Sequence, residues 1–262
     1  FKEFIGNLNK KKILKKWTGQ HINFRLEKKE ILARYVGKKG NNDICKYLLK
    51  NINVNYNSKI TNIKFNSKNW IITLNNKNKV FFKNLILTCP FPQLKILAPK
   101  YLKKSIHNLK VNMLPNVTVM VSYKNYNKLP ISSIKFNDEI IAWAANENTK
   151  KRFTTNESLW TIQCTEIFSK KIIDLIKKNK NKYQSIVLSK FETLLGYQTK
   201  NIVYKNIHGW KYSYSKSSTK LESFWSIKNN LGVCGDWFVG PKAEDAWLSA
   251  RSLFLKIKKK PS

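Results

Sequence analysis

The stretch from Leu231 to Leu253 constrains the fold of this chain more than any other part of the sequence. Leu231 to Cys234 is typical of a short buried strand, and Gly235 and Asp236 follow it before a loop and a helix that runs to the C-terminus. A glycine lets the backbone approach a ligand closely, and free N–H groups at a helix N-terminus favour electron-rich groups. This order of elements therefore predicts a ligand site. The alternative is a strand, turn and helix that only pack together.

The charge of the chain raises the question of a nucleic-acid partner. Its 262 residues carry 50 Lys and Arg against 15 Asp and Glu, a formal net charge of +35. Such a charge is typical of proteins that bind nucleic acid or anionic membranes. Only four of the basic residues are arginines, however, and readers of phosphate and guanine favour the rigid fork of arginine. We therefore expect no nucleic-acid partner; a lysine-driven binder of nucleic acid or anionic surfaces is the alternative.

Cysteine and histidine usage argues against a disulfide framework and a metal site. The four cysteines form no C-x-x-C pair and mostly lie in apolar runs, which indicates buried thiols in a reducing compartment and hence a cytoplasmic location. The three histidines show no H-x-x-x-H spacing, so we expect no metal. No window approaches the ~18 uninterrupted apolar residues of a spanning helix, so we expect no membrane association. No pattern specifies an oligomeric state.

Apolar periodicity predicts a mixed fold. Alternating segments separated by Asn- and Lys-rich turns predict an antiparallel meander, whereas the continuous run from Leu85 to Cys89, ending at Pro90, predicts a fully buried parallel strand. Together they indicate an α/β domain with an attached, largely antiparallel α+β domain. The other expected strands cover 54–56, 60–65, 70–74, 80–82, 117–123, 140–145, 159–165 and 202–208, and helices are expected at 166–178 and 182–195.

Six motifs, in order, resemble those of the FAD-dependent amine oxidases, and of their renalase-like branch in particular. They are Tyr35 to Gly40, Leu87 to Gln93, Ile141 to Ala144 followed by Thr149 to Arg152, Trp160 to Gln163, His208 to Tyr212, and Gly235 to Trp237. The resemblance implies a Rossmann-like FAD/NAD(P)-binding domain lacking its N-terminal βαβ unit, over 37–98 and 229–262. It also implies an α+β substrate domain with a mainly antiparallel sheet, over 1–36 and 99–228.

The resemblance further implies FAD as cofactor and hydride transfer from a small reduced substrate to the flavin, with O2 as acceptor. Trp210 and His208 are then expected to line the substrate side as catalytic residues; the alternative is a core aromatic and a structural histidine. Asp236 is expected to accept hydrogen bonds in the ribityl or pyrophosphate region, and the helix start to face the flavin ring edge. The cofactor-binding residues so implied are Gly235, Asp236, Ala243, Glu244, Asp245, Ala246, Ile60 and Pro90.

The sequence also departs from the family pattern. None of the nine glycines is spaced G-x-G, so the G-x-G-x-x-G fingerprint that holds the FAD pyrophosphate is absent. Because that fingerprint precedes all these motifs in the family, we expect Phe1 to fall inside a longer protein. Asp245 and Ala250 stand where the family has glycines, and an Asp245 side chain is expected to crowd the flavin. The alternative function is a non-catalytic relic that cannot bind FAD.

Overall fold

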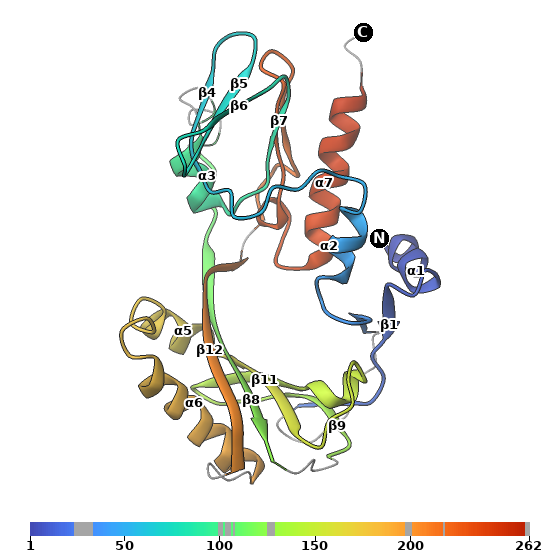
Figure 1. The fold of residues 1–262 in the computed structure, drawn as a ribbon, viewed down its shortest axis with the longest axis vertical. Coiled ribbons are helices and arrows are strands. Elements are labelled where there is room, and N and C mark those ends of the chain that lie inside the picture. Colours follow the sequence, from blue (N-terminus) through green and yellow to red (C-terminus); the bar gives the residue numbers. More distant parts are fainter. Residues whose placement is uncertain are drawn as a thin grey trace. The chain divides into compact units, whose positions relative to one another are not determined.

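The computed structural model describes residues 1–23, 34–98, 102, 106, 108–124, 129–196, 201–216 and 218–259. The chain divides into two compact units (Figure 1). Unit 1 comprises Phe1, Asn53–Leu114 and Tyr212–Ser262, and unit 2 comprises Lys2–Ile52 and Pro115–Lys211. Both are discontinuous in sequence. The assignment of a FAD-binding and a substrate domain to the segments given above stays a prediction. No helix within the described ranges is long and apolar enough to cross a membrane.

Unit 2 is built around a six-stranded sheet with the strand order β12-β8-β11-β10-β9-β2. The pairs β8–β11, β11–β10 and β10–β9 are antiparallel, and β2 joins β9 in parallel. The sheet is therefore mainly antiparallel. The strands are β2 (Gln20–Asn23), β8 (Met113–Tyr123), β9 (Ile131–Lys135), β10 (Ile141–Asn146), β11 (Ser158–Cys164) and β12 (Ile202–Ser215).

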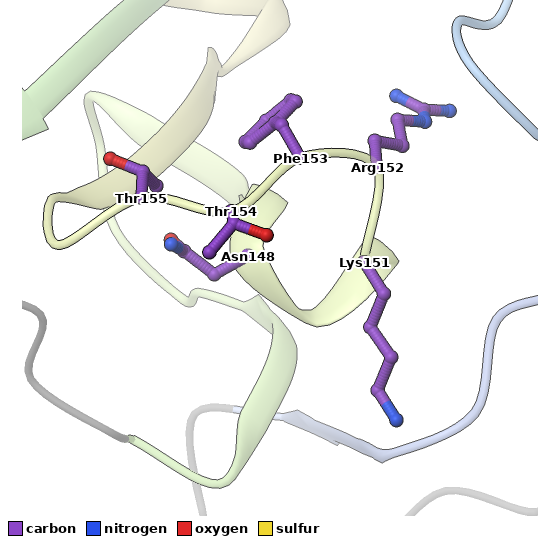
Figure 2. Close-up of a pocket in the computed structure, with 6 residues that line it drawn as sticks. All are labelled: Asn148, Lys151, Arg152, Phe153, Thr154 and Thr155. Atoms are coloured by element: carbon purple, nitrogen blue, oxygen red, sulfur yellow. The ribbon is translucent and has the colours of Figure 1, made fainter.

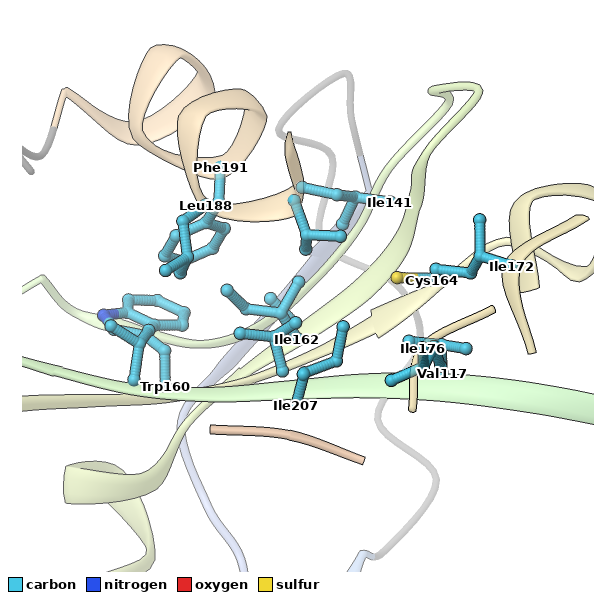
Figure 3. Close-up of a cluster of buried hydrophobic side chains, with 14 of the residues drawn as sticks. Val117, Ile141, Trp160, Ile162, Cys164, Ile172, Ile176, Leu188, Phe191 and Ile207 are labelled. Carbon is cyan, nitrogen blue, oxygen red and sulfur yellow. The ribbon is translucent and has the colours of Figure 1, made fainter. Parts of the chain in front are cut away.

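One face of this sheet packs against two helices, α5 (Glu166–Ile172) and α6 (Lys180–Leu195), as Figure 3 shows. Strand β8 points every second residue to this face, because successive side chains of a strand alternate between faces. The Thr165 hydroxyl accepts the Phe168 N–H at 3.2 Å and so caps α5. The core consists of Val117, Val119, Val121, Tyr123, Ile141, Ala144, Trp160, Ile162, Cys164, Ile172, Ile176, Val187, Leu188, Phe191 and Ile207.

The remaining elements of unit 2 lie within residues 2–48 of the chain, except for one short helix that follows β10. Strands β1 (Leu14–Lys16) and β3 (Tyr35–Gly37) pair in antiparallel fashion. A small second core contains Trp17, Val36 and Ala145, with Trp143 packed against it. The helices are α1 (Lys2–Lys10), α2 (Asp43–Leu48) and the 3-10 helix η1 (Glu147–Lys150).

Unit 1 contains two three-stranded sheets. In the first, with order β13-β14-β7, β14 pairs in parallel with β7 and in antiparallel fashion with β13. The second is the antiparallel meander β4-β5-β6, and the indole N–H of Trp70 on β5 donates to the Asn229 carbonyl at 2.9 Å. The elements are β4 (Ile60–Phe65), β5 (Trp70–Leu74), β6 (Lys79–Phe82), β7 (Leu85–Leu87), α3 (Phe91–Leu97), β13 (Phe224–Ser226), β14 (Leu231–Val233), η3 (Asp236–Phe238) and α7 (Ala243–Lys258).

Four sequence-based predictions are wrong in detail. The helix expected at 166–178 ends at Ile172, and turns follow it. Residues 54–56 form no strand: Tyr56 begins a turn and is 76% exposed. Strand β7 is parallel as predicted but not fully buried, because Ile86 lies opposite Gly232, which has no side chain to cover it, and is 50% exposed. Strand β12 continues to Ser215, well past the predicted end at residue 208. Cys164 and Cys234 are buried as expected, whereas Cys45 is exposed.

Candidate functional site

The candidate site of unit 1 lies at the carboxyl ends of β7 and β14. Because these strands are parallel, the segments that follow them emerge at the same edge of the sheet, where open α/β sheets bind their ligands. The Cys234 amide donates to the Leu87 carbonyl at 3.2 Å and extends the ladder one step beyond β14. Gly235 and Asp236 follow at this edge, and Pro90 follows β7.

Trp237 connects the segment that follows β14 with the segment that follows β7. Its indole N–H donates to the Cys89 carbonyl at 3.2 Å. The ring is 1% exposed, stacks on Phe238 with a centroid distance of 3.9 Å, and lies 5.0 Å from the Phe91 ring. This packing holds the residues after β14 in one position relative to those after β7.

Gly235 is held from its other side by Ser249 of α7. The Gly235 amide donates to the Ser249 hydroxyl at 3.0 Å, and that hydroxyl donates to the Glu222 carbonyl at 2.6 Å. A Cβ at position 235 would lie 2.7 Å from the Trp237 indole nitrogen. The space that the missing side chain leaves is thus filled by Trp237 of the same chain.

Asp236 is half-buried at the start of η3. Its carboxylate accepts the Trp237 amide at 2.9 Å. Burial raises the pKa of Asp236, an effect that the Trp237 amide opposes and the charge of Asp245 reinforces. The carboxylate remains a hydrogen-bond acceptor at the sheet edge, as required for contact with ligand hydroxyls.

The first turn of α7 offers two N–H donors. The Asp245 and Ala246 amides donate to the Lys242 carbonyl at 3.0 and 3.4 Å. The Ala243 and Glu244 amides have no acceptor among the described residues, as is usual for the first N–H groups of a helix. Together with the Asp236 carboxylate, they form a set that fits a group with hydroxyls and an electron-rich ring edge, such as the flavin end of FAD.

The Asp245 side chain has a structural role at this helix start. Its carboxylate accepts the Lys242 amide at 2.8 Å. It also packs closely on Gly240, since a Cβ there would lie 2.8 Å from the carboxylate oxygen. The carboxylate is therefore turned back onto the residue that precedes the helix. It stabilises the positive end of α7 by a contact within the chain.

The other two predicted cofactor residues also belong to unit 1. The Pro90 carbonyl accepts the Leu94 amide at 3.0 Å, and Pro90 precedes the first turn of α3. Ile60 opens β4 opposite Leu74 and is partly buried against the core of unit 1.

His208 and Trp210 lie next to each other on β12 in unit 2, with ring centroids 4.4 Å apart. Both are exposed, Trp210 by 57%, so Trp210 is not a core aromatic. Gly209 and Lys211, which alternate with these two residues, lie on the face of the sheet that the helices cover. A Cβ on Gly209 would lie 2.7 Å from Ile173, and Lys211 forms an ion pair with Asp174 at 2.8 Å. By strand alternation, the two aromatic rings occupy the opposite face of the sheet.

Sequence reasoning did not predict the part that Ser249 plays in this site. The sequence feature that points to this role is a small polar residue on the helix after the Gly-Asp pair, a position typical of close packing against a strand. Within the described residues, no group of three His, Cys, Asp or Glu side chains is placed to hold a metal ion.

Three solved structures of similar fold share low sequence identity with this chain. A protein assigned as a protoporphyrinogen oxidase from Exiguobacterium sp. 255-15 has a TM-score of 0.63 at 12% identity, over 85% of this chain and 52% of that one. Wild-type putrescine oxidase bound to putrescine has a TM-score of 0.55 at 10% identity, over 87% of this chain and 54% of that one. A variant of putrescine oxidase redesigned in its cofactor binding gives 0.58 at 11% identity, over 87% and 54%. This chain thus spans about half the length of these structures.

The mixed α/β fold with mostly antiparallel sheets, predicted from the sequence, is confirmed by these likenesses. The model of the family described as flavin containing amine oxidoreductase matches residues 11–250. That range includes all the candidate site residues of both units. The chain therefore belongs to the flavin containing amine oxidoreductase family.

Proposed function

We propose that the protein is an FAD-dependent oxidoreductase of the renalase-like branch that oxidises a small reduced substrate in the cytoplasm, with O2 as electron acceptor. One observation carries the proposal. The edge of the parallel pair β7–β14 brings the Asp236 carboxylate together with the start of α7, in a chain of a flavin-containing family. A bound FAD would supply the hydride-accepting ring, and the protein positions and tunes it.

In this proposal, several residues of unit 1 contact different parts of the cofactor. We propose that the Asp236 carboxylate accepts hydrogen bonds from the hydroxyls of the cofactor. The Ala243 and Glu244 amides donate to the electron-rich edge of the ring, where the positive end of α7 stabilises negative charge by about 0.3–2 kcal/mol. Asp245 and Ala246 complete this helix start, and Ile60 and Pro90 contact the cofactor through backbone atoms.

On unit 2, we propose that His208 and Trp210 bind the substrate. The two rings form an edge-to-face pair at 4.4 Å on the face of the sheet that the helices leave open. The exposed Trp210 ring offers an apolar face beside the imidazole nitrogens of His208, which suits a small substrate with both apolar and polar groups. Neither side chain is needed in the core, so both are free to contact a ligand.

The protein made from its complete gene tests the cofactor proposal. We expect a yellow protein with absorbance near ~450 nm, from which denaturation releases FAD, the redox cofactor of the proposed reaction. Asp236→Asn is expected to weaken FAD binding by about tenfold, the loss of one charge-assisted hydrogen bond. Asp174→Asn on the surface of unit 2 is the matched control and is expected to bind FAD as the wild type does. A colourless protein that gains no thermal stability from added FAD contradicts the proposal.

The substrate is identified by mixing the flavin-loaded protein with candidate donors in the absence of air. An amine or a dihydronicotinamide compound that is the substrate bleaches the flavin absorbance, and admitting O2 restores it. Trp210→Ala is expected to slow the bleaching. Exposed Tyr204, on the same strand, provides the control Tyr204→Ala. Bleaching at the same rate in both variants would remove Trp210 from the substrate site.

A further inference from the structure

An open pocket of about 400 Å³ lies on unit 2, on the loop between η1 and β11. Figure 2 shows that the side chains of Lys151 and Arg152 leave this loop in opposite directions, and that the hydroxyls of Thr154 and Thr155 also point to opposite sides. None of these residues belongs to the proposed flavin or substrate site. The pocket is lined by Asn148, Lys151, Arg152, Phe153, Thr154 and Thr155.

The loop is held in shape without a ligand. The Asn148 amide group donates to the Glu157 carbonyl at 2.8 Å, and its oxygen accepts the Leu159 amide at 2.8 Å. The Lys15 ammonium donates to the Lys151 carbonyl at 2.7 Å. These bonds fix the ends of the loop, so little entropy is lost when a ligand binds to it.

Positive charge accumulates around this loop. Burial, followed by the charges of Arg152, Lys151 and Lys38, lowers the pKa of Lys15. Four cationic side chains from three separate segments therefore repel one another. An anion that binds among them relieves this repulsion.

Two carboxylates beside this cluster, those of Glu147 and Asp43, already have partners and also interact with Arg152. Glu147 pairs with Lys150 at 2.6 Å and with Arg152 at 3.6 Å. Asp43 accepts two backbone amides of the loop that precedes it. Arg152, whose side chain is 8% exposed, also donates to the Gly37 carbonyl at 3.1 Å and to Asn41. The open charge at the pocket is therefore that of Lys151, because Arg152 is paired with Glu147 and donates to Gly37 and Asn41.

We propose that this pocket binds the diphosphate group of a small ligand. Lys151 supplies a flexible point charge for the phosphate oxygens, and the exposed hydroxyl of Thr154 supplies a donor. Phe153, 51% exposed at the rim, provides an apolar face for an organic part of the ligand. A diphosphate carries more negative charge than a single phosphate, so it interacts more strongly with the Lys151 ammonium.

Calorimetric titration with inorganic pyrophosphate at physiological salt tests the proposal. The double variant Lys151→Ala/Thr154→Val is expected to bind pyrophosphate at least about tenfold more weakly, as the loss of charge-assisted contacts implies. The matched control is Lys177→Ala/Thr193→Val, which removes the same charge and the same group from exposed positions elsewhere on unit 2. This control is expected to bind within about twofold of the wild type, the scale of small surface effects.

An equal loss in both double variants overturns the proposal, because it shows attraction by net charge alone. The proposal is also overturned if the Lys151→Ala/Thr154→Val variant binds pyrophosphate as tightly as the wild type does. A titration with ADP separates the sources of the diphosphate. If Phe153→Ala weakens the binding of ADP but not that of pyrophosphate, the pocket is assigned to an organic diphosphate. If the wild type and Phe153→Ala bind ADP and pyrophosphate with equal affinity, the pocket is assigned to inorganic diphosphate. Asp236→Asn leaves pyrophosphate binding unchanged, so the result is independent of the flavin site.

Discussion

Replacing Ser249 by alanine isolates the contact that positions the Gly-Asp segment. The Ser249 side chain is fully buried, and its hydroxyl bridges the Gly235 amide at 3.0 Å and the Glu222 carbonyl at 2.6 Å. Alanine fills nearly the same volume, so the main loss is that of the two hydrogen bonds. Since an unpaired backbone group costs about 1–3 kcal/mol when buried, we expect the free energy of unfolding of unit 1 to fall by about 2–4 kcal/mol.

Two measurements check this prediction. Urea unfolding followed by tryptophan fluorescence gives the loss of stability, and hydrogen exchange of the peptide that contains Gly235 shows whether its amide loses protection. Ser252→Ala on the same helix is the control. Among the described residues, the Ser252 side chain bonds to the Ser223 hydroxyl alone, at 2.9 Å, so we expect a loss of about 1 kcal/mol. Equal losses in the two variants, or unchanged exchange at Gly235, would refute the reasoning.

Three further substitutions have expected outcomes. Trp237→Phe keeps a ring but removes the indole donor, so thermal or urea unfolding is expected to show a loss of about 1–3 kcal/mol; an unchanged midpoint contradicts the role of this bond. Gly232→Ala places a methyl group 2.9 Å from Leu253, and we expect the same assays to show a loss of about 1–3 kcal/mol from overpacking. Burial and then Arg34 lower the pKa of His21 below its ordinary value of 6.5. The imidazole of His21 therefore binds a proton more readily in the unfolded chain than in the folded one. Stability is highest above pH 6.5 and falls as the pH drops toward the lower pKa of the folded state. His21→Phe is expected to flatten this dependence in unfolding measured from pH 7 to 5.

The sequence predicts those parts of the fold that depend on neighbouring residues. An uninterrupted apolar run before Pro90 indicates a parallel strand, and β7 is parallel to β14. The exposure of Ile86, in contrast, depends on Gly232, its partner across the sheet and far along the chain. Val54 and Tyr56 have β-forming side chains, but no strand pairs with them within the described residues, so their propensity does not decide their structure.

The same distinction holds for the candidate site. Asp236 at the end of a strand can be recognised from the residues around it. The bond from Trp237 to the Cys89 carbonyl and the bridge through Ser249 connect segments that only tertiary folding brings together. The contact of the Asp245 carboxylate with the Lys242 amide likewise forms only in the folded helix start. The crowding of the flavin by Asp245 stays a prediction.

The order of segments in the two units has a consequence for how this protein folds during synthesis. Strand β7 is made before residues 115–211, which belong to unit 2, and its parallel partner β14 is made after them. The edge that carries Asp236 therefore cannot form until this whole segment has been synthesised, and closing so long a loop is slow. Until then β7 is an unpaired apolar edge, open to pairing with other chains. The order of segments thus gives nascent chains a time in which they can aggregate through β7.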